Sequence, residues 1–182
     1  MSTPSTAAPP VEPMALRRFL GNFPTGVTVV TCRRGDVVHG ATVNAFTSVS
    51  LAPPLVLTAL DRRSRACGHL AEGAFVVNVL AEDQRDVALH FAGRPMPGPV
   101  PWLDQDGDHP RLDGVVGHLF CRVWRNYEGG DHVLHVAEVE DLRSHGGRPL
   151  LFHRGDFPRV ADGDPVWSLT LDGWAPRFTT TR

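Results

Sequence analysis

The feature of this chain that most constrains its fold is a series of short β-branched or apolar segments separated by turns rich in glycine, proline and aspartate. Segments of about four to eight such residues, bounded by turn residues, are typical of β-strands. The expected strands are residues 27–32, 37–42, 55–60, 74–80, 118–125, 133–140 and 150–152, with Val166 to Leu171 as a last strand or a docking arm. About six or seven strands with hairpin-like links favour a mainly β fold with short helices, built as a closed or nearly closed antiparallel barrel.

Three short helices are expected between these strands. An apolar stripe at Leu16, Phe19, Leu20 and Phe23 predicts a helix over residues 14–22, which Pro24 ends. The others span residues 64–71, where Ser64 is a candidate N-cap, and residues 82–91. Residues 93–114 are expected to form an irregular loop with Trp102 and Leu103 tucked inward, and Trp124 is interpreted as a core residue. A doubly wound parallel sheet needs regular strand–helix alternation, which is missing.

The overall composition excludes several classes of partner and chemistry. The 182 residues fit one domain, and a net charge of -2 gives no reason to expect nucleic acid or an anionic membrane surface as a partner. All 18 basic residues are arginine. Without lysine, Schiff-base chemistry is excluded, and an anion has to be met by arginine, hydroxyl or backbone N–H groups.

The ends of the chain and its cysteines indicate the compartment. Cys32, Cys67 and Cys121 are odd in number and widely spaced, which favours reduced, buried thiols in a cytoplasmic protein. Residues 1–13 read as a disordered tail without the features of a signal peptide, and no apolar run approaches the roughly 20 residues that span a bilayer. The expected domain is residues 14–160, followed by a C-terminal extension or docking arm over residues 161–182.

Several catalytic motifs are missing from the sequence. It contains no GxGxxG after the first strand, no Walker A loop, no HExxH and no GxSxG elbow. The closest histidine pair is His132 and His135, but residues three apart on a strand point to opposite faces. We therefore expect no metal site.

The stretch from His39 to Ser50 is the most promising place for a ligand. Small side chains there let a ligand lie close to the backbone, and neutral donors and acceptors recur along an extended chain. These polar residues are Thr42, Asn44, Thr47, Ser48 and Ser50. From the residues alone, a strand and turn with its polar side in solvent explains the same pattern.

A set of motifs, all in order along the chain, resembles the flavin reductase family, the short-chain reductases that supply reduced flavin to two-component monooxygenases. The matching segments are Phe23 to Val27, Gly40 to Ser50 with Pro53-Pro54, Asp61 to Arg65, Phe91 to Gly93, Leu112 to Gly114, Gly130 to His132 with Glu138-Val139, and Pro149 to Phe152. The resemblance runs from about Met14 to Phe157. It departs at Phe157, where many relatives carry tyrosine.

The resemblance implies an FMN-binding split β-barrel, a Greek-key-like antiparallel barrel, in a homodimer with two flavin sites near the subunit interface. The implied reaction is hydride transfer from NADH or NADPH to FMN or FAD, with reduced flavin passing to a partner monooxygenase. Such transfer needs two stacked rings rather than a strong protein acid or base.

The resemblance also implies a site, residue by residue. Thr42, Val43, Asn44, Ala45 and Ser48 would contact the flavin ring and ribityl chain, partly through backbone. Asp61, Ser64, Arg65 and Ala66 would lie around the ribityl and phosphate end. Phe91 and Gly93 would flank the flavin, and His132 would face the nicotinamide as the catalytic candidate.

Simpler interpretations of these residues stay open at this point. Arg62, Arg63 and Arg65 also fit a solvated face, His132 a turn histidine, and Phe91 an ordinary core position. Two other functions share the fold. One is a flavin-bound oxidase or reductase that acts directly on an organic substrate in a biosynthetic pathway, and the other is a flavin-binding module without turnover.

Overall fold

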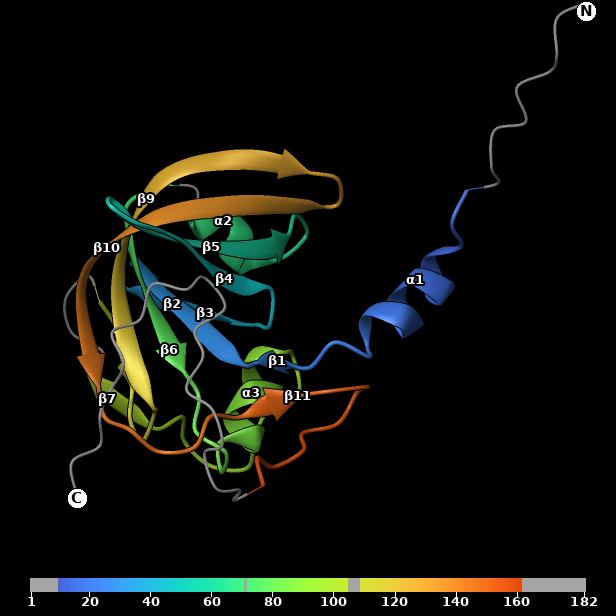
Figure 1. Cartoon of the computed structure of the whole chain (residues 1–182). Helices are drawn as coiled ribbons and strands as arrows, with labels where there is room; N and C mark the ends of the chain where they lie inside the picture. The colour runs from blue at the N-terminus through green and yellow to red at the C-terminus, as the bar shows by residue number, and fades with distance from the viewer. Residues whose placement is uncertain (1–9, 71, 105–108, 162–182) are drawn as a thin grey trace, which may run out of the picture.

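The computed structural model describes residues 10–70, 72–104 and 109–161, and a seven-stranded antiparallel sheet dominates it (Figure 1). Its strand order is β3-β2-β6-β9-β10-β5-β4. The strands are β2 (Thr28–Arg34), β3 (Val37–Val43), β4 (Phe46–Leu51), β5 (Pro54–Asp61), β6 (Ala74–Val79), β9 (Gly117–Gly129) and β10 (His132–Ser144). The two end strands of this order, β3 and β4, follow each other in the chain. The sheet therefore curls into a barrel with a seam between them.

The link across this seam is two residues long. Asn44 and Ala45 separate β3 from β4, and the carbonyl of Ala45 accepts a hydrogen bond from the N–H of Ala59 in β5 at 3.0 Å. This bond extends the antiparallel pairing of β4 with β5, in which Phe46 faces Thr58, into the two-residue link. The expectation of a split, nearly closed antiparallel barrel is confirmed.

Smaller elements surround the barrel. Two small sheets pair β1 (Thr25–Gly26) with β11 (Leu151–Phe152) and β7 (Trp102–Asp104) with β8 (Arg111–Leu112). The helices are α1 (Pro13–Leu20), α2 (Arg65–His69) and α3 (Arg85–Phe91). Within the described residues, no helix is long and apolar enough to span a membrane.

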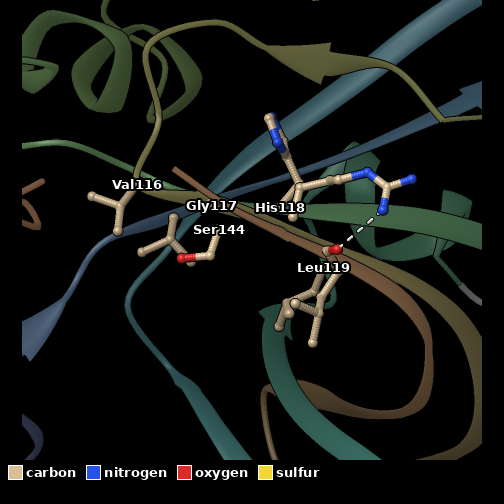
Figure 2. Close-up of a pocket in the computed structure, with 8 residues that line it drawn as sticks. Val116, Gly117, His118, Leu119 and Ser144 are labelled. Atoms are coloured by element: carbon tan, nitrogen blue, oxygen red, sulfur yellow. Dashed lines mark hydrogen bonds between the residues drawn. The ribbon is translucent and has the colours of Figure 1, made fainter. Parts of the chain in front are cut away.

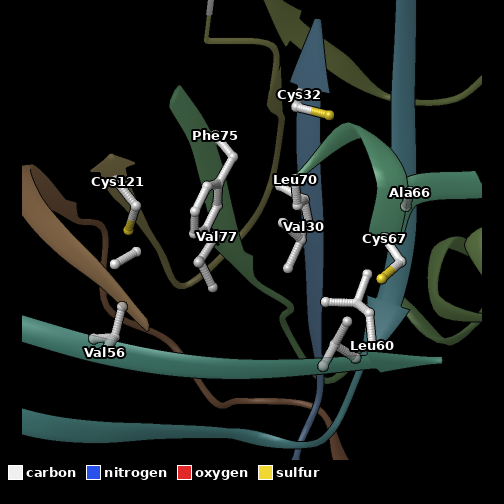
Figure 3. Close-up of a cluster of buried hydrophobic side chains, with 12 residues drawn as sticks. Val30, Cys32, Val56, Leu60, Ala66, Cys67, Leu70, Phe75, Val77 and Cys121 are labelled. Atoms are coloured by element: carbon white, nitrogen blue, oxygen red, sulfur yellow. The ribbon is translucent and has the colours of Figure 1, made fainter. Parts of the chain in front are cut away.

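The core is divided in two by β2 and β6. Alternate residues of a strand point to opposite faces, so Val30 and Val77 pack inside the barrel with α2, whereas Val29 packs on the other side with α3. Figure 3 shows the barrel cluster, with side chains from β2, β5, β6 and α2 converging on one space. Burial on both faces explains why residues 27–32 form an almost continuous apolar run. All three cysteines are free and buried, as expected.

The helices differ from the sequence-based expectations at their ends. Helix α1 ends at Leu20 rather than Asn22, because the Asn22 side chain turns back to donate to the carbonyl of Phe19 at 2.9 Å. Helix α3 starts at Arg85 rather than Glu82, because the Gln84 side chain accepts from the N–H of Ala81 and closes a turn there.

Some expected positions are wrong. Leu103 is 50% exposed rather than tucked inward, whereas Trp102 does pack on the second core cluster. Trp124 is 45% exposed, because β9 and β10 are longer than predicted and their hairpin reaches beyond the barrel (Figure 1). The expected strand Val166 to Leu171, the extension over 161–182 except residue 161, and residues 1–9 of the expected tail lie outside the described residues.

Candidate functional site

Strand β3 presents a different surface to each of two helices. Gly40 and Thr42 share the face toward α3, where an added Cβ on Gly40 would lie 2.5 Å from Cε1 of the Phe91 ring. The Thr42 hydroxyl donates to the carbonyl of Ala88 in α3 at 2.6 Å. On the other face, the ring of His39 stacks on that of His69 in α2, with centroids 3.8 Å apart. The strand thus fixes both helices that carry candidate site residues.

The segment after β3 exposes polar groups at the seam. Asn44, Ala45 and Ser48 are exposed, and within the described part of the chain no hydrogen bond engages the side chains of Asn44 or Ser48. By contrast, Val43 is 5% exposed and its side chain belongs to the barrel core. Val43 can therefore meet a ligand only through its backbone, whereas Asn44 and Ser48 offer free side chains.

The Thr42 hydroxyl is not available as a donor. Its proton is used in the bond to Ala88, so Thr42 can offer a ligand only its oxygen lone pairs or its backbone. Thr47 and Ser50 are also engaged, since Thr47 donates to the carbonyl of Ser48 and Ser50 accepts from the N–H of Ala52. The run of five neutral groups seen in the sequence is therefore reduced mainly to Asn44 and Ser48.

A second group of candidates meets where β5 ends. The Asp61 carboxylate accepts hydrogen bonds from the Arg63 backbone N–H and guanidinium, and these bonds lower its pKa to about 2. The N–H of Ser64 donates to the carbonyl of Asp61 at 2.9 Å, and Ser64 is the N-cap of α2. Its side chain makes no capping bond, so its hydroxyl is open to a ligand. Ala66 is 5% exposed and packs in the barrel core, which leaves only its backbone for binding.

His132 lies beside this group. It is the first residue of β10 and pairs with Asp61 of β5 in the sheet register. Its Nδ1 lies 2.7 Å from a carboxylate oxygen of Asp131, and its side chain is 41% exposed. Because that bond also stabilises the charged carboxylate, the pKa of Asp131 is lowered. The arrangement leaves Nε2 of His132 free for a hydrogen bond to a ligand.

An arginine that the sequence analysis did not single out, Arg62, connects the end of β5 to the turn between β9 and β10. Arg62 donates through Nε to the carbonyl of Gly130 at 2.8 Å, and its guanidinium pairs with Glu128. Its backbone N–H also donates to the carbonyl of Asp131. From the sequence, Arg62 and its neighbouring arginines fit a solvated face. Nothing local in the sequence indicates that Arg62 reaches the β9–β10 turn.

Phe91 and Gly93 lie at the end of α3. The Phe91 ring packs on Gly40 and contacts the Trp102 ring edge-on at 5.9 Å between centroids, as part of the second core cluster. Gly93 is exposed with φ +92°, and a Cβ there would meet nothing within 4 Å. A positive φ favours glycine, which is the reason for this residue at the helix end.

The candidates thus form two groups. Thr42 and Phe91 lie at the α3 side, whereas Asp61, Ser64 and His132 lie at the end of β5. The bond between Ala45 and Ala59 attaches the polar seam segment to β5, two residues before Asp61. An apolar hollow of about 210 Å³ lies elsewhere, at the far ends of β9 and β10, lined among others by Gly117, His118 and Ser144 (Figure 2). None of the sequence-predicted site residues lines that hollow.

Comparison with known proteins decides the family. Residues 20–161 match the model of the flavin reductase like domain. The chain belongs to the flavin reductase family. The resemblance seen in the motifs is therefore confirmed.

Individual members of the flavin reductase family are similar over most of the chain. An NADH-dependent flavin reductase of a Rhodococcus species is 46% identical over 154 residues, which cover 82% of this chain and 87% of that protein. The reductase component of a 4-nitrophenol 4-monooxygenase/4-nitrocatechol 2-monooxygenase of Rhodococcus opacus is 36% identical, covering 88% of this chain and 89% of that protein. Among solved structures, the Streptomyces globisporus C-1027 NADH:FAD oxidoreductase SgcE6, in complex with NAD and FAD fragments, superimposes with a TM-score of 0.75 at 39% identity. That match covers 86% of this chain and all of that one.

Proposed function

We propose that this chain is an NADH-dependent flavin reductase that supplies reduced flavin to a separate monooxygenase. The observation that carries this proposal is the family match over residues 20–161, which includes every candidate site residue. NADH is favoured over NADPH, and FAD is a favoured acceptor, because two similar proteins are described as an NADH-dependent flavin reductase and an NADH:FAD oxidoreductase. The name of the Rhodococcus opacus relative supports a monooxygenase partner. The three free thiols fit action in the cytoplasm.

The residues at the seam fit a flavin. Asn44, Ser48 and Ser64 are neutral, polar and without side-chain hydrogen bonds in the described part of the chain, which suits the polar edge of a flavin ring and a ribityl chain. Thr42, Val43, Ala45 and Ala66 would contribute mainly backbone. Arg65 is the first residue of α2, and its side chain lies outside the described part of the structure. Its guanidinium would meet the phosphate together with the Ser64 hydroxyl.

When bound, flavin supplies a ring that accepts a hydride from the nicotinamide. The protein's own task is positioning. Gly40 lets the Phe91 ring lie close to β3, and Gly93 lets the chain turn at the end of α3. Phe91 and Gly93 would then both flank the flavin ring. His132, with Nδ1 held by Asp131, directs Nε2 toward the nicotinamide side as a hydrogen-bonding group. No charged side chain with a strongly raised or lowered pKa is needed as acid or base.

The decisive experiment follows NADH and NADPH oxidation at 340 nm with purified protein, with and without added FMN or FAD. Rapid turnover that saturates in free flavin is expected, with NADH preferred. Flavin that stays bound, with turnover dependent on an organic substrate, would instead support the oxidase or reductase alternative. Flavin binding without any NADH oxidation would leave a binding module.

A charge-matched pair of variants tests the phosphate end. Arg65→Ala is expected to weaken FMN affinity by about tenfold or more, because a charge-assisted hydrogen bond to phosphate is lost. Arg148→Ala removes the same charge from a surface arginine whose pair with Glu82 spans 3.9 Å, and should leave FMN affinity unchanged. Equal titrations of flavin fluorescence for Arg65→Ala and the unmodified protein would remove Arg65 from the site.

We also propose a homodimer in which α1 packs on the second copy. Helix α1 has no buried residue and stands away from the barrel (Figure 1), yet it exposes large apolar side chains, with Phe19 73% and Phe23 just beyond it 74% exposed. Exposed apolar surface of this kind marks an interaction site. Sedimentation should give the dimer mass, and Phe19→Ser with Phe23→Ser should give monomers with an unchanged circular dichroism spectrum. A monomer mass for the unmodified chain at all working concentrations would contradict the dimer.

A further inference from the structure

A chain of hydrogen-bonded polar side chains runs from the exposed Asn126 of β9 through the buried His135 of β10 to the buried Cys67 of α2. The Nδ1 atom of His135 lies 2.8 Å from Oδ1 of Asn126, and its Nε2 lies 3.7 Å from Sγ of Cys67. His135 is 1% exposed and Cys67 is 5% exposed. The sequence pattern places neither side chain in the functional site. It shows His135 only as one of two histidines whose spacing on a strand does not suit a metal.

The hydrogen-bonding partners fix the direction of this chain. An amide oxygen only accepts, so Nδ1 of His135 carries the proton and donates it to Asn126. The lone pair on Nε2 is then left to accept the S–H of Cys67. Burial lowers the pKa of His135 and raises that of Cys67, so both groups are neutral, as this direction requires. The nearest charges to Cys67 are Arg62 and Asp61, and the buried Thr58 faces His135 across the sheet register.

This series of hydrogen-bonded side chains ends in the first turn of α2, next to Ser64. The N–H of Cys67 donates to the carbonyl of Ser64 at 3.1 Å, so the thiol lies one turn from the N-cap of α2. His135 lies on the same strand as His132, three residues along. Ala66 and Leu70 pack α2 on the barrel, and the last residue of the helix, His69, is held by the stacked His39 ring and by a hydrogen bond from Arg34 to its carbonyl. The hydrogen bond from Cys67 to His135 acts at the other end of α2, in the turn that follows Ser64, and gives that turn a directional contact.

We propose that Asn126, His135 and Cys67 form a positioning relay that sets the orientation of the first turn of α2 and thereby aims the Ser64 hydroxyl at the flavin phosphate. This inference rests on the proposed function. The three residues do not touch flavin; they act through α2. The relay couples the β9–β10 hairpin, which carries His132, to the phosphate end of the same site.

The test compares the affinities for FMN and riboflavin, which differ by the phosphate alone. His135→Phe keeps a ring without nitrogens, and Cys67→Ala removes the thiol. Each is expected to lower the FMN-to-riboflavin affinity ratio by about three- to tenfold, the effect of one lost hydrogen bond, and the double variant should lose no more than either single variant. Cys121→Ala is the matched control, since this thiol is fully buried in the same core cluster and forms no side-chain hydrogen bond within the described residues. It should leave the ratio unchanged.

The outcomes separate the relay from the proposed function. A preference for FMN that survives in both single variants, or falls equally in Cys121→Ala, overturns the relay and leaves the reductase assignment standing. Equal affinity of the unmodified protein for FMN and riboflavin overturns the phosphate site itself and the relay with it. A second measurement needs no variant: nitrogen NMR of the unmodified protein should show His135 protonated at Nδ1, and protonation at Nε2 alone overturns the relay.

Discussion

A single close approach, between Gly40 and Phe91, decides how α3 meets the barrel. An ordinary side chain at position 40 of β3 would occupy the space that the Phe91 ring takes. The sequence shows Gly40 as one of several small residues and as the first residue of a family motif. Its specific task depends on a residue about fifty positions away, so it could not be read locally.

Gly40→Ala should therefore affect both stability and the site. The added Cβ would lie 2.5 Å from Cε1 of Phe91, and the ring has to move. We expect a loss of about 1–3 kcal/mol in the free energy of unfolding, as for other overpacked positions, together with weaker flavin binding. Urea denaturation and flavin fluorescence titration measure the two effects. Gly26→Ala is the control, because a Cβ there meets nothing within 4 Å and should change stability by less than about 0.5 kcal/mol.

At the scale of elements, α3 is attached to β3 by packing and by one hydroxyl. Thr42→Val keeps the shape of the side chain but removes the bond to the carbonyl of Ala88, with an expected cost of about 1 kcal/mol. Hydrogen exchange of the α3 amides should become faster, whereas exchange in β9 and β10 should not change. Thr47→Val is the control, since that exposed hydroxyl bonds only to the adjacent Ser48. Unchanged α3 protection in Thr42→Val would show that packing alone holds the helix.

The elements also show what the sequence could and could not predict. The strands were predictable where apolar periodicity was strong, as in β2 and β6, and the barrel followed from their number and short links. The ends of α1 and α3 were not predictable in this way, because side-chain hydrogen bonds of Asn22 and Gln84 decide them and apolar periodicity does not show such bonds. The family motifs led to the exposed polar residues Asn44 and Ser48 and to the half-buried Ser64. They could not show that Thr42 is engaged by α3, or that Val43 and Ala66 face the core, because these facts arise from packing between distant segments.

At the scale of the whole molecule, the protein buries polar as well as apolar groups. His118 and His135 are almost fully buried, on β9 and β10, and each has a side-chain or backbone partner. Burial is the largest cause that lowers the pKa of both. Both histidines are neutral in the folded state at pH values where an unfolded chain already binds protons, so they link folding to pH.

The sign of this linkage gives a prediction for global stability. A histidine whose folded pKa lies below the ordinary value of 6.5 binds a proton on unfolding, so stability is fully present above about pH 6.5 and decreases as the pH falls below it. Each such group lowers the free energy of unfolding by at most about 1.4 kcal/mol per pH unit. Asp61 acts in a lower pH window, because its pKa near 2 lies below the ordinary 3.8 and its contribution to stability is lost only as the pH falls from about 4 toward 2.

Urea denaturation at pH 7.5, 6.5 and 5.5 should therefore show a decrease in the free energy of unfolding that is confined to the step from pH 6.5 to 5.5. His135→Phe should reduce that slope by about half, since His118 still titrates. A free energy of unfolding that stays constant from pH 7.5 to 5.5 would mean that the buried histidines accept protons without opening the barrel.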